Sequence, residues 1–136
     1  MGDAFCLEFK VRDYECDLQG IVNNAVYQHY LEHARHEFLV SRGVDFAALA
    51  KEGIHPVVVR AELDYKRSLR PGESFVVETT CTREGKVRIV FLQDIRHADG
   101  GLVLSSRFVA TVLDGRGRPR IPEGFAASVL GEGSGS

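Results

Sequence analysis

A carboxylate lies just before the predicted start of the longest helix in this sequence. Asp17 is followed by Gly20-Ile21-Val22 and then by Asn23 and Asn24, either of which can cap a helix through its side-chain oxygen. The N–H groups of a first helical turn lack helical partners and carry partial positive charge. They can stabilise a developing oxyanion, while a nearby carboxylate attacks an acyl carbon or takes a proton from water. The same residues also fit a plain turn or helix cap, so both interpretations stay open.

Three histidines, His29, His33 and His36, fall on one face of the predicted helix, at spacings that could present imidazoles to a metal. Their order does not match the H-E-x-x-H arrangement of zinc hydrolases. They lie beside or opposite the apolar stripe of the helix, which favours a solvated face or a subunit contact. We therefore predict no metal and no cofactor.

Two further residues could contribute a nucleophile or a second carboxylate. Cys16 stands next to Asp17, but no histidine is tied to it by a motif, so we interpret it as a packed or shielded thiol. Glu62 lies in a segment of alternating charge, which is typical of an exposed strand face. Neither residue is predicted to be catalytic.

Length and composition indicate one ordinary globular domain. The chain has 136 residues, of which 44% are hydrophobic and 26% charged, with a net charge of −2. This charge gives no general field for nucleic acid or an anionic membrane, and the arginines of the run 115–120 are too few to change that view. Three cysteines without metal-ligand spacing, and no signal peptide or long apolar span, predict a reduced, cytoplasmic protein without membrane insertion.

One long helix is predicted from about Asn24 to Arg42. Its apolar residues recur at helical spacing and form a stripe that must be buried, namely Tyr27, Tyr30, Leu31, Ala34 and Phe38. Gly43 can supply the left-handed residue after its end. At 1.5 Å per residue the helix is about 28 Å long, enough to cross a whole sheet.

Five strands and a second, short helix after Asp45 account for most of the remaining chain. The strands are predicted near residues 5–11, 57–66, 75–83, 87–95 and 102–113 from apolar alternation and the turns between them. In the second strand, one face is expected to carry Val57, Val59, Ala61, Leu63 and Tyr65. This half-polar strand is the best candidate for a sheet edge, whereas the apolar last strand suits an interior position.

The predicted fold class is α+β, with a five-stranded antiparallel sheet wrapped around one long helix. Residues 1–122 are expected to form the single domain, and residues 123–136 a flexible C-terminal tail because of their Gly/Ser-rich end. A lone amphipathic helix has only the sheet on which to bury its stripe.

The order of elements, together with the run from Asp17 to Tyr27, resembles the hot-dog-fold acyl-CoA thioesterases of the 4-hydroxybenzoyl-CoA thioesterase type. The shared pattern is D-x-x-G-[IVH]-V-x-x-x-x-Y, placed between a first strand and a long helix. The resemblance implies hydrolysis of an acyl-CoA or aroyl-CoA thioester to the free acid and CoA. It also implies homodimers, or dimers of dimers, with active sites at the subunit interface.

The resemblance assigns roles to individual residues. It implies Asp17 as the catalytic carboxylate and the backbone N–H of Asn24 as the group that polarises the thioester carbonyl. Substrate contacts are expected at Gly20, Ile21, Val22, Asn23 and Tyr27. Contacts with the CoA phosphates are expected at Arg83, Lys86 and Arg88, although an ordinary solvated turn fits those cations equally well.

Two other functions fit the same fold. One is a non-catalytic acyl-CoA binding or sensing module, because fold does not fix function. The other is an acyl-thioester dehydratase or hydratase, which the Asp-x-x-Gly pattern disfavours.

Overall fold

The computed structural model describes residues 4–131 and contains the five predicted strands. In chain order the elements are β1 (Phe5–Lys10), the 3-10 turn η1 (Asp13–Glu15), α1 (Asn24–Ser41), α2 (Phe46–Lys51), β2 (His55–Tyr65), β3 (Ser74–Glu84), β4 (Arg88–His97), β5 (Leu102–Leu113) and α3 (Glu123–Leu130). The two predicted helix starts are confirmed, because the side chains of Asn23 and Asp45 accept hydrogen bonds from the first turns of α1 and α2.

All strand pairs are antiparallel, and the strand order is β1-β3-β4-β5-β2. The predicted edge position of β2 and interior position of β5 are therefore both confirmed. The consecutive strands β3, β4 and β5 form a meander through short turns. β2, which precedes them in the chain, pairs with β5 at the far side of this meander. The two edges of the sheet are β1 and β2.

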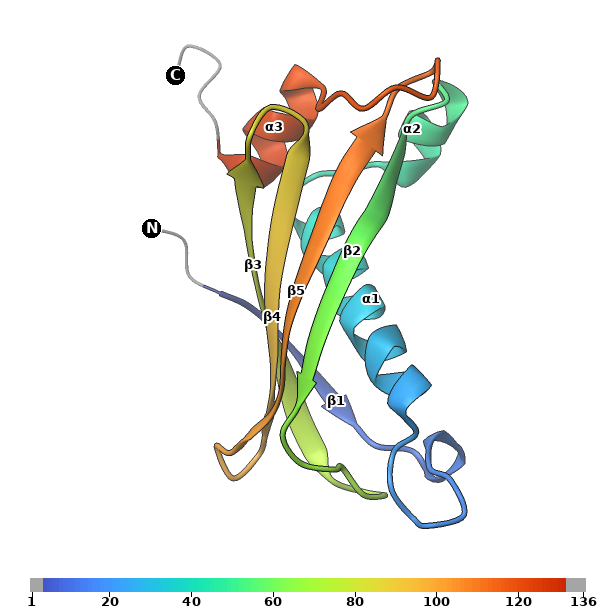
Figure 1. The fold of residues 1–136 in the computed structure, drawn as a ribbon, viewed down its shortest axis with the longest axis vertical. Helices are drawn as coiled ribbons and strands as arrows, with labels where there is room; N and C mark the ends of the chain where they lie inside the picture. Colours follow the sequence, from blue (N-terminus) through green and yellow to red (C-terminus); the bar gives the residue numbers. More distant parts are fainter. Residues whose placement is uncertain (1–3, 132–136) are drawn as a thin grey trace.

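Helix α1 runs along one face of the curved sheet and buries its apolar stripe there (Figure 1). Aromatic contacts tie it to the sheet across its whole width: Phe9 packs on Tyr30, Phe38 on Phe91, and Tyr27 on Tyr65. Burial of these rings supplies the main stabilisation of the helix, because a helix of this length is marginal by itself. In the described residues, no helix is both long and apolar enough to cross a membrane.

A β-bulge in β2 corrects the predicted faces of that strand. Val58 pairs with Ala110, but the next pair joins Arg60 to Val109, so Val59 is an extra residue. An extra residue shifts the alternation by one position, which turns Val58 rather than Val59 toward α1. The prediction that Val59 shares the face of Tyr65 is therefore wrong, while Tyr65 does face α1 as expected.

Helix α3 forms where we predicted part of a flexible tail. It buries Phe125, Ala126 and Val129 against the core, and Gly131 ends it in the left-handed conformation at φ +68°. The apolar residues lie at i, i+1 and i+4, which is a helical spacing. The Gly/Ser-rich segment beyond them obscured this short signal, and residues 132–136 lie outside the described part of the chain.

Candidate active site

Asp17 lies on a small hairpin that projects from the end of β1. Cys16 pairs with Val22 as an antiparallel bridge, and Asp17 N–H donates to Ile21 O at 2.9 Å. Gly20 closes the turn with φ +75°, a conformation that a residue with a Cβ rarely adopts. The Asp17 side chain is exposed, and its Oδ1 accepts from Gln19 N–H at 2.8 Å. This bond leaves the other carboxylate oxygen available to a ligand.

The hairpin leads directly into the N-terminus of α1. Asn23 Oδ1 accepts from Ala25 N–H at 2.9 Å, which satisfies one of the first N–H groups of the helix. Within residues 4–131, the backbone N–H of Asn24 has no hydrogen-bond acceptor, and Asn24 is exposed. An open N–H at the positive end of an 18-residue helix is suited to an anionic oxygen.

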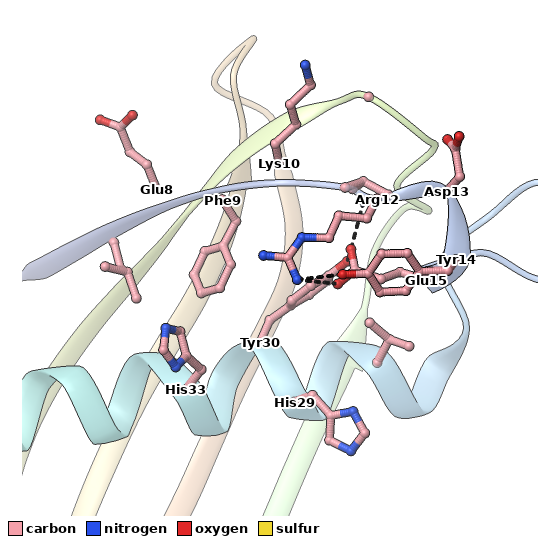
Figure 2. A pocket seen from close by; sticks show the side chains of 14 residues that line it. Glu8, Phe9, Lys10, Arg12, Asp13, Tyr14, Glu15, His29, Tyr30 and His33 are labelled. Carbon is pink, nitrogen blue, oxygen red and sulfur yellow. Dashed lines mark hydrogen bonds and ion pairs between the residues drawn. The ribbon is translucent and has the colours of Figure 1, made fainter.

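A partly buried carboxylate, that of Glu15, fastens the segment before Asp17 to α1. Tyr30 donates from its hydroxyl to Glu15 Oε1 at 2.7 Å, and the same oxygen accepts from Arg12 N–H at 2.8 Å. Figure 2 shows these side chains converging between η1 and α1. Burial, and then the bond to the Glu15 carboxylate, raise the pKa of Tyr30, so the phenol stays neutral. The position of the Asp17 hairpin therefore depends on this bond.

A large cavity of about 1040 Å³ lies between β1, η1 and α1. Figure 2 shows Phe9 pointing toward α1, and Glu8 and Lys10 pointing away from it. Asp17 does not line this cavity, although it lies two residues beyond Glu15, which does. The cavity therefore borders the hairpin without containing the predicted catalytic carboxylate.

The three histidines of α1 have different surroundings. His29 and His33 line the large cavity, and the ring of His33 meets the edge of Phe9. His36 instead stacks on Phe46 of α2, with ring centroids 4.6 Å apart. In the part of the chain that the structure describes, no three His, Cys, Asp or Glu side chains form a group that could hold a metal ion.

A second, smaller cavity of about 180 Å³ forms a groove between α1 and the β2 side of the sheet. Arg35 enters it from α1, with its guanidinium 4.0 Å from the centre of the Phe108 ring and Nη1 donating to Gln93 Oε1 at 2.9 Å. Burial lowers the pKa of Arg35 to about 10, so the side chain stays charged at neutral pH. We did not predict this pair, because its residues are 58 positions apart in the sequence. A glutamine on the otherwise apolar face of β4, which also carries Ile89, Phe91 and Ile95, was the only signal.

The residues expected to contact substrate divide into two groups. Gly20 and Ile21 are half-buried and Asn23 is exposed, all on the hairpin or at its end. Val22 and Tyr27 are buried in the core, and the Tyr27 hydroxyl accepts from Leu69 N–H at 2.9 Å. The side chains of Val22 and Tyr27 thus stabilise the junction of hairpin and helix, and their burial does not support the predicted substrate contact.

The predicted phosphate-binding cations lie at the end of the sheet opposite the Asp17 hairpin. Arg83 donates to Lys86 O within the turn between β3 and β4, and Lys86 and Arg88 are exposed. The Asp17 hairpin follows the other end of β1, which is paired with the start of β3 (Figure 1). Along a strand, the distance from Ser74 to Arg83 is about 30 Å. A single chain therefore does not bring these cations to its own Asp17.

The thiol of Cys16 is not set up as a nucleophile. Burial and the neighbouring carboxylates of Asp13, Asp17 and Glu15 raise the pKa of this thiol. Since the thiolate is the reactive form, the carboxylate beside it is the better candidate for chemistry. This agrees with the sequence-based interpretation of Cys16 as a shielded residue.

Comparison with known proteins identifies the family. The family model of the thioesterase-like superfamily matches residues 11–129. The acyl-acyl carrier protein thioesterase ATL3 of Arabidopsis thaliana, a chloroplastic protein, is 38% identical over 132 residues, which are 96% of this chain and 70% of the plant protein. A second relative from the same plant, the acyl-acyl carrier protein thioesterase ATL2, is 38% identical over 90% of this chain and 66% of its own length.

Solved structures share the fold. A Staphylococcus aureus protein determined in complex with CoA superposes with a TM-score of 0.87 over 95% of this chain and 84% of that protein, at 17% identity. A 1,4-dihydroxy-2-naphthoyl-CoA thioesterase from Synechocystis gives 0.85 over 93% of this chain and 95% of that one, at 18% identity. Identities this low show the fold alone. The matched fold confirms the predicted hot-dog architecture, and the chain belongs to the thioesterase-like superfamily, with the class of thioester hydrolase that we predicted.

Proposed function

We propose that the chain hydrolyses an acyl-CoA or aroyl-CoA thioester to the free carboxylic acid and CoA, using Asp17 and the backbone N–H of Asn24. The observation that carries this proposal is the hairpin from Cys16 to Val22, which carries an exposed carboxylate and leads directly into the open N-terminus of α1. A carboxylate and an oxyanion donor are the two groups that thioester hydrolysis requires.

The chemistry follows from these two groups. The thioester carbonyl oxygen accepts a hydrogen bond from Asn24 N–H, and the negative charge that develops there is stabilised at the positive end of α1. Asp17 then either attacks the acyl carbon, giving an anhydride that water opens, or takes a proton from the attacking water. In both routes the carbon–sulfur bond breaks, CoA leaves as its thiol after taking up a proton, and water supplies the hydroxyl of the acid. Both roles of Asp17 are open.

A homodimer through the β2 edge completes the proposed site. β2 offers unpaired backbone groups along one side, and Val58 and Val59 on it are about half exposed. If two copies pair their β2 edges about a two-fold axis, the strands run antiparallel, so the β3–β4 turn of one copy comes to the hairpin end of the other. Arg83, Lys86 and Arg88 can then bind the CoA phosphates at the partner's Asp17, which one protomer cannot do. Two such dimers can pair in turn.

Two observations bear on the carrier of the acyl group. The basic turn favours the phosphates of CoA. The plant relatives are named for acyl carrier protein thioesters, which makes an acyl carrier protein the second candidate. A phosphopantetheine arm presents the same thioester in both cases, so the carboxylate chemistry does not depend on the carrier.

Release of free thiol tests the proposal. Purified protein is offered a panel of acyl-CoA and aroyl-CoA esters and the same acyl groups on an acyl carrier protein. Hydrolysis of CoA esters supports the proposal. Hydrolysis of the carrier-protein esters alone would indicate that the substrate is an acyl group on an acyl carrier protein. Tight CoA-ester binding without thiol release would instead indicate a sensing module. Hydration or dehydration of an enoyl or hydroxyacyl ester without thiol release would indicate the dehydratase or hydratase alternative.

A further inference from the structure

The groove that contains Arg35 is apolar apart from a few side chains at its margin. Its walls come from four elements of the fold: Leu39 on α1, Val58 on β2, Ile89 and Phe91 on β4, and Ala110 on β5. Phe46 of α2 and Phe125 of α3 also line it. The other titratable groups along it are Glu32 and His36 of α1. Such a lining is suited to a hydrocarbon chain.

Arg35 is held in this groove by a buried and fully satisfied glutamine. Gln93 is 0% exposed, and its Nε2 donates at 3.0 Å both to Leu31 O and to Thr79 Oγ1. These two bonds fix the orientation of the amide and turn Oε1 toward Arg35. The guanidinium also stacks over Phe108, so its position is set by packing as well as by hydrogen bonding.

Among the described residues, Arg35 has no ion-pair partner at contact distance, although Glu32, three residues earlier on α1 and also on the groove, favours its charged form. Within residues 4–131, no carboxylate oxygen lies within 4.0 Å of the Arg35 guanidinium, whereas Arg96 and Arg107 on the solvent face of the sheet each pair with glutamates. Of the five N–H bonds of the guanidinium, only one has a protein acceptor among the described residues. Burial of a cation without a contacting anion is costly, and the cost falls when a ligand oxygen reaches it.

The distance to the proposed catalytic groups is compatible with an acyl chain. Arg35 follows Asn24 by eleven residues on the same helix, a rise of about 16 Å. With C–C bonds of about 1.5 Å, an extended chain advances about 1.3 Å per bond, so about a dozen bonds cover that rise. The groove also borders β2, the edge that the proposed dimer would share.

We propose that Arg35 is a specificity-determining residue that binds an oxygen on the distal part of the acyl group, a carboxylate best and a hydroxyl less well. The proposal rests on the proposed function, because it concerns the acyl group of that same substrate. The fatty part of the ligand packs on the apolar walls, and the guanidinium supplies its unmatched donors to the oxygen. A plain hydrocarbon chain leaves those donors unpaired.

The test compares substrates of equal length in two variants. Arg35→Met removes the charge and keeps much of the bulk. The control, Arg42→Met, removes a cation at the C-cap of the same helix that also lies over a ring, that of Phe38, but outside the groove. With dodecanedioyl-CoA, Arg35→Met should lose about 10- to 100-fold in kcat/KM, because a charged hydrogen bond is lost. With dodecanoyl-CoA, the kcat/KM of Arg35→Met should stay within about threefold of that of wild type. With hydroxydodecanoyl-CoA, the loss should lie between the losses for the other two esters. Arg42→Met should leave the ratios of kcat/KM between the three substrates unchanged.

Binding of the free acids separates this proposal from the proposed function. Calorimetry with dodecanedioate and dodecanoate needs no hydrolysis, so wild type should prefer the diacid and Arg35→Met should lose the preference even if no ester is cleaved. Arg35→Lys keeps the charge but lacks the planar guanidinium, so it should recover part of the preference for the diacid. Equal losses on all ligands, or a weaker dimer with unchanged substrate ratios, would overturn the proposal and assign Arg35 to packing or to the subunit contact. A melting curve for each variant shows that it is folded.

Discussion

Tyr30 and Glu15 are joined by a hydrogen bond of 2.7 Å that fastens the segment before Asp17 to the middle of α1. The carboxylate is 13% exposed and also holds the backbone N–H of Arg12. The phenol thus connects the core, through Phe9 and Phe75, to the hairpin that carries the proposed catalytic group.

Removing the hydroxyl in Tyr30→Phe should loosen this connection while keeping the ring packed. We expect a loss of about 1.5–3 kcal/mol in the free energy of unfolding, because a hydrogen bond to a partly buried, charged group is removed. We also expect kcat for a CoA ester to fall more than KM rises, since Asp17 is positioned less well. Tyr14→Phe, which changes an exposed phenol on η1, is the matched control. Equal effects of the two substitutions would refute the positioning role.

The same phenol should make stability sensitive to high pH. Burial and Glu15 raise the pKa of folded Tyr30, whereas in the unfolded chain tyrosine ionises near its ordinary value of about 10. The folded state therefore holds the proton more tightly, so the stabilisation is complete below about pH 10 and is lost as pH rises toward the folded pKa. In urea titrations, wild type should lose more stability than Tyr30→Phe between pH 9 and about pH 11. Parallel curves for the two proteins would contradict this assignment.

The β2 edge should hold the dimer. Val59 is 50% exposed at the bulge of β2, and Leu92 is 49% exposed on β4 in the interior of the sheet. Val59→Lys should give monomers in light scattering and a large loss of activity, because the partner's basic turn is removed. Leu92→Lys places the same charge at an equally exposed site and should leave the dimer intact. A Val59→Lys protein that remains a fully active dimer would place the interface elsewhere.

The basic turn should act on binding rather than on chemistry. Replacing Lys86 and Arg88 together by alanine should raise KM for CoA esters at least about fivefold at low salt with kcat little changed, since phosphate contacts are equal in the ground and transition states. The difference should shrink at high salt. The double variant Arg116→Ala/Arg118→Ala removes equal charge from the β5–α3 connection and serves as control. An unchanged KM would leave Lys86 and Arg88 as a solvated turn.

Regular apolar periodicity made most of the fold predictable from the sequence. The features that interrupt this periodicity could not be predicted. The helix from Asn24 was foreseeable because its apolar stripe and its Asn23 cap are local features. The bulge at Val59 was not, since one extra residue changes the face of a strand without changing its composition. Helix α3 has a true helical spacing, but only over eight residues beside a Gly/Ser-rich end.

The candidate site was predictable only where it is local in sequence. Asp17 and Asn24 belong to one continuous pattern, so their neighbourhood could be expected. The contact of Arg35 with Gln93 depends on how α1 crosses β4, which no local pattern specifies. The burial of Val22 and Tyr27 likewise depends on the segment around Leu69, which packs against both.

The most direct test of the account is the turnover of Asp17→Asn on a good CoA ester. Asparagine keeps an oxygen that can accept from Gln19 N–H, so the hairpin, the melting temperature and the affinity for a non-hydrolysable CoA thioether should be nearly unchanged. It cannot act as a nucleophile or a base, so kcat should fall about 10²- to 10⁴-fold. Asp13→Asn, which neutralises an exposed carboxylate on η1, should retain wild-type turnover. If Asp17→Asn keeps kcat within about threefold of wild type, a difference of less than about 1 kcal/mol in the barrier, Asp17 does not perform the chemical step.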